Sequence, residues 1–170
     1  PEHHSDSMEA TFSQIPGLRV VIPSSPARAY GLLLAAIRDP DPVIFMEPKR
    51  IYRLVKEEVI DNGEALPLDV CFTLREGTDV TLVSWGAMIH ETLQVADELA
   101  TEGIQAEVID VATIKPLDMD TILQSVEKTG RCVIIQEANP TCSVSSEIAA
   151  NIAERALTSL MAPVQRVTGY

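Results

Sequence analysis

Residues 77–111, GTDVTLVSWGAMIHETLQVADELATEGIQAEVIDV, decide the fold class of this chain. DVTLVSW (residues 79–85) and AEVIDV (residues 106–111) are short apolar runs with the length of buried strands. Between them, after Gly86, apolar residues recur at helical spacing at Ile89, Leu93, Ala96 and Ala100. A strand, a helix and a second strand in succession predict a right-handed crossover between parallel strands.

The same alternation continues to the end of the chain. A second helix is predicted in LDMDTILQSVEKTG (residues 117–130), with Asp118 as its N-cap and Gly130 as its stop. The strand-like run CVIIQE leads to a third helix, SSEIAANIAERALTSL, which Ser145 or Ser146 can cap. APVQRVTG then starts a fourth strand. The sequence therefore predicts an α/β fold with a mostly parallel sheet.

The first 48 residues have a similar character. A short helix is predicted from Asp6 to Ile15, and LRVVIP and PVIFMEP are predicted strands. Ser25 is a good N-cap for the helix between these strands, and Pro26 sits at the first helical position, where its missing N–H costs nothing. The apolar face of that helix consists of Ala29, Leu32, Leu33, Ala36 and Ile37.

Residues 49–76 interrupt the pattern, because charge rises, DNGEALPLD carries turn residues and no period persists. We interpret this stretch as a linker with one or two short strands. The predicted organisation is thus a partial domain at residues 1–48, the linker, and a second domain at residues 77–170. Two strands in the first part are too few for a closed sheet, so we expect a fragment of a longer chain.

Composition argues against two classes of partner. The chain has 13 Lys and Arg against 25 Asp and Glu, and this net charge of −12 repels the phosphates of nucleic acids. The apolar runs are far shorter than the roughly 18 residues that span a membrane, and the first ten residues are too polar for a signal peptide. We therefore expect neither nucleic-acid binding nor membrane insertion.

Cysteine usage indicates a reducing compartment. Cys71, Cys132 and Cys142 are odd in number and widely spaced, and no C-x-x-C occurs. Cys132 lies in a strand-like run and is most simply a small core residue. The sequence predicts reduced, structural thiols.

Familiar site motifs are absent from the sequence. It contains no G-x-x-x-x-G-K-[ST], no G-x-G-x-x-G, no H-E-x-x-H and no G-x-S-x-G, so an autonomous phosphate cradle is not predicted. Any functional inference must come from the combination of several segments.

Four short patterns in order carry such a combination. They are H-S-x-x-x-E-A, P-G-[LI]-x-V-V-x-P, G-L-L-x-x-[AS]-I-x-D-x-[ND]-P and F-x-E-P, and they begin at His4, Pro16, Gly31 and Phe45. With the segments from GTDVTLVSW to APVQRVTGY, they resemble the beta subunit of thiamine-diphosphate-dependent 2-oxo acid dehydrogenases. These are the decarboxylating components of the pyruvate, branched-chain and acetoin dehydrogenase complexes.

The resemblance implies a fold and a reaction. The chain looks like the second half of the pyrimidine-binding domain followed by the transketolase-type carboxy-terminal domain. The implied activity is oxidative decarboxylation of a 2-oxo acid with reductive acylation of a lipoyl domain. The implied cofactor is thiamine diphosphate, which supplies the electron sink for decarboxylation.

The resemblance also implies partners. The alpha subunit of the family holds the diphosphate and magnesium, and the cofactor-activating glutamate lies upstream of the residues present here. An alpha subunit, a second beta subunit and a lipoyl-bearing acyltransferase are the expected partners, in an alpha2-beta2 heterotetramer. We expect this chain alone to be inactive. The compartment would be the cytoplasm in a bacterium or the mitochondrial matrix in a eukaryote.

His4 matches the active-site histidine of the family, which is implied to contact the substrate carboxylate and to assist reductive transfer to the lipoyl group. An imidazole suits that role because it titrates near neutral pH. A carboxylate at Asp6, often glutamine in relatives, would raise the pKa of His4 if it lay close. His3 is predicted to be only a neighbour. The alternative for His4 is a residue at a helix start without a chemical role.

The segment AAIRDPDP matches a loop that binds a structural potassium ion in several relatives. Ala36, Asp39 and Asp41 would be the ligands, since carbonyl oxygens and a carboxylate suit a hard cation. The alternative is an ordinary helix end, because Asp39 precedes Pro40.

Other notable residues have predicted structural roles. His90, at the start of a helix, is expected to be structural or interfacial. Glu47-Pro48 and Tyr52-Arg53 are expected to pack the junction between the domains or to meet the alpha subunit. In EANPTCSVSSE, where relatives usually carry a glycine pair, the residues Thr141 to Ser143 predict a loop that sits differently.

Two rival functions remain open from the sequence. One is a transketolase-like or 1-deoxyxylulose-5-phosphate synthase-like enzyme, in which one long chain carries the diphosphate domain. The other is a non-catalytic assembly module that contributes an interface only.

Overall fold

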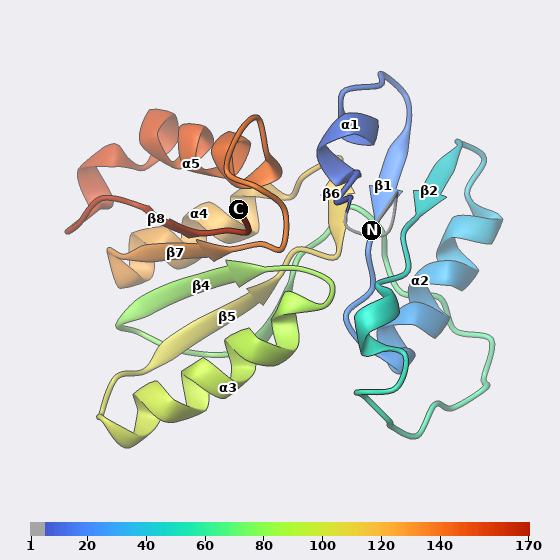
Figure 1. The fold of residues 1–170 in the computed structure, drawn as a ribbon, viewed down its shortest axis with the longest axis horizontal. Coiled ribbons are helices and arrows are strands. Elements are labelled where there is room, and N and C mark those ends of the chain that lie inside the picture. The colour runs from blue at the N-terminus through green and yellow to red at the C-terminus, as the bar shows by residue number, and fades with distance from the viewer. Residues whose placement is uncertain (1–5) are drawn as a thin grey trace.

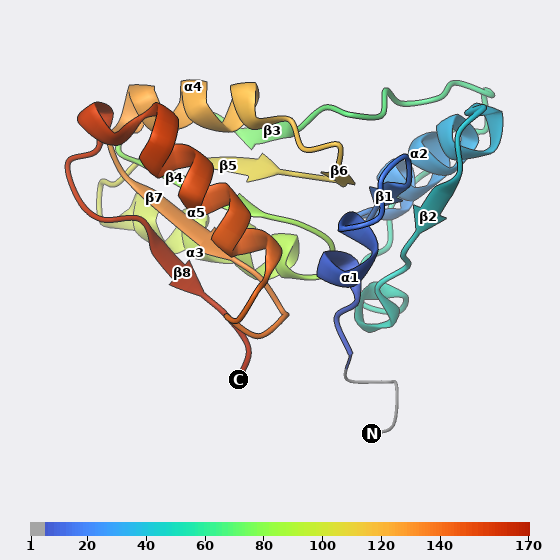
Figure 2. The same ribbon diagram turned by 90° about the horizontal axis from the view of Figure 1, so that it is seen from above.

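The computed structural model describes residues 6–170, which form two units side by side, each built on its own sheet (Figures 1 and 2). The larger sheet has the strand order β3-β5-β4-β7-β8, and the smaller one has the order β2-β1-β6. The strands of the larger sheet are β3 (Phe72–Arg75), β4 (Val80–Ser84), β5 (Ala106–Asp110), β7 (Cys132–Ile135) and β8 (Gln165–Val167).

The predicted parallel pairing is confirmed in the larger sheet. Strand β4 pairs in parallel with both β5 and β7, and β7 pairs in parallel with β8. Strand β3, which falls in the predicted linker, adds an antiparallel edge next to β5. The sheet is therefore mixed at one edge and parallel elsewhere.

Helices cover both faces of the larger sheet. They are α3 (Met88–Thr101), α4 (Met119–Thr129) and α5 (Val144–Arg155). Leu82 and Val108 contact the α3 side, in one apolar cluster with Ala96. Val83 and Ile109, the next residues along the same strands, belong to the cluster on the α4 and α5 side. Because side chains alternate along a strand, α3 lies on the face opposite α4 and α5.

The predicted caps of α4 are confirmed, and that of α5 is corrected. The Asp118 carboxylate accepts a hydrogen bond from the Thr121 N–H at 3.1 Å, and Gly130 ends α4 in the left-handed region at φ 68°. Helix α5 begins earlier than predicted, with Ser143 as its N-cap residue, and Ser145 is already helical and fully buried.

The reason for the earlier start of α5 is a side chain from outside the helix. The Oε1 atom of Gln136, just after β7, accepts a hydrogen bond from the Ser145 N–H at 3.0 Å. This satisfies one of the first helical N–H groups, which a local cap would otherwise bind. Local sequence signals could not reveal this partner, which is nine residues away.

The smaller unit contains the elements α1 (Glu9–Ser13), β1 (Arg19–Val21), α2 (Pro26–Arg38), β2 (Val43–Phe45) and the 3-10 turn η1 (Lys49–Ile51). Strands β1 and β2 are parallel across α2, and Ser25 caps α2 by accepting from the Arg28 N–H at 3.4 Å, as predicted. The helix predicted from residue 6 to residue 15 is shorter, since it spans only Glu9–Ser13, and the chain turns at Gly17, whose φ is 77°.

A strand that the sequence pattern did not reveal connects the two units. It is β6 (Thr113–Lys115), which pairs antiparallel with β1 of the smaller sheet and lies beside it in Figure 1. Since β6 follows β5 after only two residues, the chain runs directly from the larger sheet into the smaller one. The predicted boundaries at residues 48 and 76 remain predictions. Strand β6 lies within the predicted second domain, yet it belongs to the sheet of the first part. No helix in the described part of the chain is long and apolar enough to cross a membrane.

The irregular part of the predicted linker gives a test of the organisation. Residues 52–65 are almost all exposed, whereas Glu107 lies in the core at 3% exposure. We expect brief digestion with a glutamate-specific protease to cut the chain first after Glu57, Glu58 or Glu64, since exposed loops open most readily. Mass spectrometry of the earliest fragments measures this. First cuts within β4 to β7, for example after Glu107, would contradict the arrangement.

Candidate active site at the junction of the two units

A cavity of about 360 Å³ lies between the two units. Asp6 and Ser7, the first described residues, line it from one side. The other side is formed by Trp85, which follows β4, and by Glu137, which follows β7. His4 lies outside the described residues, and this cavity borders the chain two residues after it.

Glu9 and Trp85 form the buried polar contact of this cavity. Each is 4% exposed, and the indole Nε1–H of Trp85 donates to Oε1 of Glu9 at 3.4 Å. Burial raises the pKa of Glu9, and the nearby charge of Glu137 raises it further. The carboxyl group of Glu9 therefore takes up a proton more readily than an exposed glutamate does.

Close backbone approach forms the wall of the cavity. Gly86, at φ 56°, follows Trp85, and a Cβ there would meet Ile22 Cγ2 at 2.8 Å and Pro48 Cγ at 3.3 Å. The glycine thus allows the end of β4 to approach the smaller unit, and Pro48 lies at the junction as predicted.

Polar side chains cross or border the same junction. Arg50 forms a salt bridge with Glu91 of α3 and contacts Met88 Sδ at 3.6 Å. The Tyr52 hydroxyl donates to Glu47, but Tyr52 is 60% exposed, so this pair lies at the surface of the junction. Arg53 is also exposed. Tyr52 and Arg53 are therefore accessible for the expected contact with a partner subunit.

A second buried joint lies where β5 ends. The carboxylate of Asp110 is fully buried and accepts from the Ser24 hydroxyl at 2.5 Å and from the Ala112 N–H at 3.2 Å. Burial raises the pKa of Asp110 to about 6, against the opposing effects of these hydrogen bonds and of Arg28. No sequence pattern predicted a role for Asp110. Its available signal was a carboxylate at the carboxyl end of a short, mostly apolar parallel strand.

The loop predicted to bind potassium has its carboxylates beside a guanidinium. Arg19 Nε lies 3.5 Å from Asp39 and its Nη2 lies 3.8 Å from Asp41, and Arg19 also forms a salt bridge with Asp69. Pro40 has no N–H, so the Ala36 carbonyl lacks its usual helical donor. The carboxylates of the loop thus have an internal cation, and its backbone carbonyls are the better candidates for an ion.

The remaining predicted residues lie apart from this junction cavity. His90 is in the first turn of α3, and its Nε2 is 3.2 Å from Gln94 Nε2. All three cysteines are free thiols. Burial raises the pKa of Cys132 to about 12 and also raises that of Cys71, whereas Cys142 is exposed.

The loop between β7 and α5 is held from within. The Nε2 group of Gln136 donates to the carbonyl oxygens of Ala138 at 3.1 Å and Asn139 at 2.7 Å. Cys142 adopts a left-handed φ of 51°, so the turn expected of a glycine is made by another residue.

Comparison with known proteins defines the class. Residues 71–170 match the transketolase, C-terminal domain, and residues 1–55 match the transketolase, pyrimidine binding domain. The first match covers more than half of the chain, which therefore belongs to the transketolase C-terminal domain family. The predicted fold class, a pyrimidine-binding part followed by a mostly parallel carboxy-terminal α/β domain, is confirmed.

Relatives within this class are more specific. The chain is 49% identical over 167 residues to the pyruvate dehydrogenase E1 component subunit beta of Bacillus subtilis, covering 98% of this chain and 51% of that protein. The proteins of the same name from Staphylococcus epidermidis and Staphylococcus aureus are 46% and 44% identical over the same shares. The predicted resemblance to these beta subunits is confirmed, and the chain spans about half the length of the relatives.

A solved structure supports the fold. A split gene transketolase, described as an inactive beta4 tetramer, superposes with a TM-score of 0.76 at 27% sequence identity. The match covers 94% of this chain and 50% of that chain.

Asp110 gives a pH-dependent prediction. Its pKa is about 6 in the folded protein against an ordinary value of 3.8, so the folded state binds the proton more tightly. The free energy of unfolding should therefore fall as pH rises from about 4 to 7, by about 2–3 kcal/mol from this group. Asp110→Asn should remove this decline.

The measurement is urea unfolding across that pH range. The variant with Asp120→Asn is the matched control, because Asp120 is an exposed carboxylate paired with Arg155. A stability difference between Asp110→Asn and wild type that does not change with pH would show that Asp110 is ionised throughout.

Proposed function

We propose that this chain forms part of the beta subunit of a thiamine-diphosphate-dependent 2-oxo acid dehydrogenase. With an alpha subunit, that enzyme decarboxylates a 2-oxo acid oxidatively and acylates a lipoyl domain reductively. The observation that carries the proposal is the 49% identity to a pyruvate dehydrogenase beta subunit across 98% of the chain. Because this relative is named for pyruvate, pyruvate is the proposed 2-oxo acid.

Thiamine diphosphate, when bound, supplies the carbanion-stabilising chemistry of decarboxylation. The pyrimidine end of the cofactor suits this chain, since the pyrimidine-binding family model matches residues 1–55 and a cavity of about 360 Å³ adjoins that part of the chain. Among residues 6–170, no group of three or more His, Cys, Asp and Glu side chains could hold a metal ion. We assign the diphosphate and its magnesium to the alpha subunit, as the resemblance implies.

His4 is the proposed catalytic residue of this chain. In the assembled site its imidazole would bind the substrate carboxylate and hold or release a proton during transfer to the lipoyl group. Its place in the sequence, two residues before the cavity-lining Asp6, supports this role.

The proposed partners are the alpha subunit, a second beta subunit and a lipoyl-bearing acyltransferase. Association of such subunits is supported by the related solved structure, which is described as a tetramer. The exposed side chains of Tyr52 and Arg53 beside the junction are candidates for contact with the alpha subunit. The proposed compartment is the cytoplasm of a bacterium, since the relatives above are bacterial.

We also propose a structural potassium ion at the end of α2, bound by the backbone carbonyls of Ala36, Asp39 and Asp41. The backbone supports this site, because Pro40 has no N–H and leaves the Ala36 carbonyl without its usual helical hydrogen-bond donor. The side chains of Asp39 and Asp41 would remain paired with Arg19, so their carboxylates would serve as outer partners.

Potassium binding has a direct thermal test. We expect about 100 mM potassium chloride to raise the unfolding midpoint of the full-length subunit by a few degrees over choline chloride at equal concentration, because an ion that binds only the folded state stabilises it. Calorimetry measures the midpoint, and sodium chloride controls for ionic radius. Equal midpoints in all three salts would argue that Arg19 alone neutralises the loop.

The proposed function is tested at His4. In the full-length subunit assembled with its alpha subunit, His4→Ala should lower turnover about 100-fold or more, as loss of a general acid or base does. His3→Ala is the matched control and should be mild. Steady-state turnover with lipoyl domain is the measurement, and sedimentation confirms the heterotetramer.

Other outcomes separate the rival functions. A wild-type heterotetramer without thiamine-diphosphate-dependent decarboxylation would favour the assembly module. Equal damage from His3→Ala and His4→Ala, or full activity of His4→Ala, would contradict the assignment of His4. Activity without any alpha subunit would favour a single-chain, transketolase-like enzyme.

A further inference from the structure

We propose that Glu9 is a positioning residue of the proposed active site, which fixes the start of helix α1 against Trp85 of the larger unit. Helix α1 begins five residues after His4, so the position of its first residue limits how far from the cavity His4 can lie. This inference rests on the proposed function and assigns a role to the glutamate of the H-S-x-x-x-E-A pattern.

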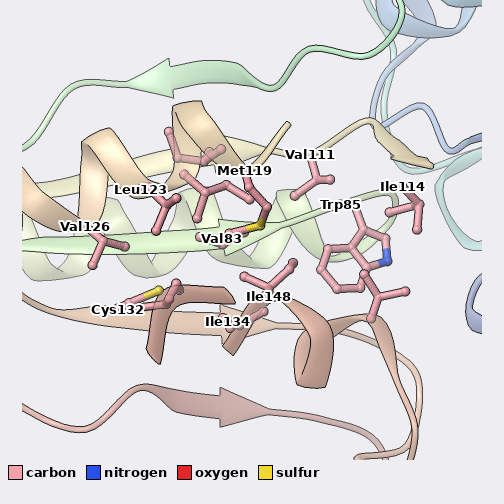
Figure 3. Close-up of a cluster of buried hydrophobic side chains, with 14 of the residues drawn as sticks. Val83, Trp85, Val111, Ile114, Met119, Leu123, Val126, Cys132, Ile134 and Ile148 are labelled. Atoms are coloured by element: carbon pink, nitrogen blue, oxygen red, sulfur yellow. The ribbon is translucent and has the colours of Figure 1, made fainter. Parts of the chain in front are cut away.

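The geometry places Glu9 between the two units. Glu9 is the first residue of α1, and its carboxyl accepts the Trp85 indole N–H at 3.4 Å. Trp85 itself belongs to the core cluster of the larger unit with Val83 and Ile148. Figure 3 shows its ring at the end of that cluster near Ile114, with the nitrogen turned away from Val83 and Ile148. A polar atom of the rigid core is thereby directed at the first residue of α1.

Helix α1 needs such an anchor. It has only five residues, too few for a helix to be stable on its own in water. Ala10 and Phe12 pack against the core cluster, and Ser13 Oγ donates back to the Glu9 carbonyl at 2.6 Å. These contacts hold the body and the C-terminal end of α1, and Glu9 supplies the contact at the end nearest His4.

The surroundings of Glu9 favour a geometric role over a charge role. No salt bridge reaches Glu9 within residues 6–170, and its donor is the neutral indole. The charged groups that line the same cavity are Asp6, Glu47, Lys49, Arg50 and Glu137. Of these, Arg50 is bound to Glu91, and Glu137 repels the charged form of Glu9. A neutral carboxyl still accepts from an indole N–H, so the contact survives protonation.

The test uses the full-length subunit assembled with its alpha subunit. We expect Glu9→Ala to lower kcat of the overall reaction about 10- to 100-fold, since misplacing a catalytic group by about 1 Å has such an effect. Glu9→Gln should recover kcat to within about threefold, because its amide oxygen can accept the same hydrogen bond. Glu127→Gln, which alters an exposed carboxylate of α4 outside the cavity, is the matched control and should match wild type.

A merely structural role is distinguished by further readouts. For Glu9→Ala, the dissociation constant for thiamine diphosphate and the sedimentation of the heterotetramer should stay within about twofold of wild type, while kcat falls. Hydrogen exchange of the peptide covering residues 6–13 should accelerate in Glu9→Ala and not in Glu9→Gln. If Glu9→Ala fails to assemble, Trp85→Phe decides, because it keeps an aromatic ring and removes the donor; it should lower kcat likewise.

The outcomes separate this proposal from the proposed function. An active wild type with full activity in both Glu9→Ala and Trp85→Phe overturns the role of Glu9 and leaves the function standing. Equal loss of kcat in Glu9→Gln and Glu9→Ala also overturns it, since a hydrogen-bond acceptor would then not be what matters. An inactive wild-type heterotetramer overturns both.

Discussion

The antiparallel pairing of β6 with β1 is the constraint on which the rest of the structure depends. Strand β6 follows β5 of the larger sheet after two residues and adds itself to the smaller sheet. The smaller sheet therefore has three strands only because the larger unit supplies one. The Ile22 N–H donates to the Ala112 carbonyl at 2.8 Å, which extends this pairing to the connecting residues. The two units cannot separate without breaking a strand pair, a large loss for so small a sheet.

The polar contacts of the junction follow from that pairing. Once β1 is fixed beside β6, the Ser24 hydroxyl reaches the carboxylate of Asp110 at the carboxyl end of β5. On the other side of the joint, the end of β4 brings Trp85 against Glu9. Both contacts bury a carboxyl group whose pKa is raised, so the joint stores two protonatable groups in a low-dielectric environment. The junction cavity lies between the two units, so the pairing of β1 with β6 also fixes the position of the cavity.

A site at such a junction suits the shared active site that the proposed function requires. The chain offers a polar wall with Glu9, Trp85 and Glu137, while its described residues include no cluster of three or more His, Cys, Asp or Glu side chains that could hold a metal ion. A diphosphate and its metal would then approach from a partner subunit, with this wall already rigid. Rigid support is useful in a catalytic site because small displacements of a reacting group reduce rate strongly.

The sequence by itself determined the elements whose signals are local. The crossover of residues 77–111, the Ser25, Asp118 and Gly130 caps and the class of protein all come from spacing, capping chemistry and an ordered set of motifs. These features depend on neighbours within a few residues, so periodicity and side-chain type reveal them.

Only the tertiary structure decided the features whose partners are distant in sequence. Strand β6 has three residues and no pattern of its own, and it exists because β1 offers an edge. The Trp85–Glu9 hydrogen bond spans 76 residues, and the Ser24–Asp110 hydrogen bond spans 86. The start of α5 depends on Gln136, a side chain outside the helix. The spacing of residues along the chain does not reveal such pairs, because folding brings together atoms that are far apart in the sequence.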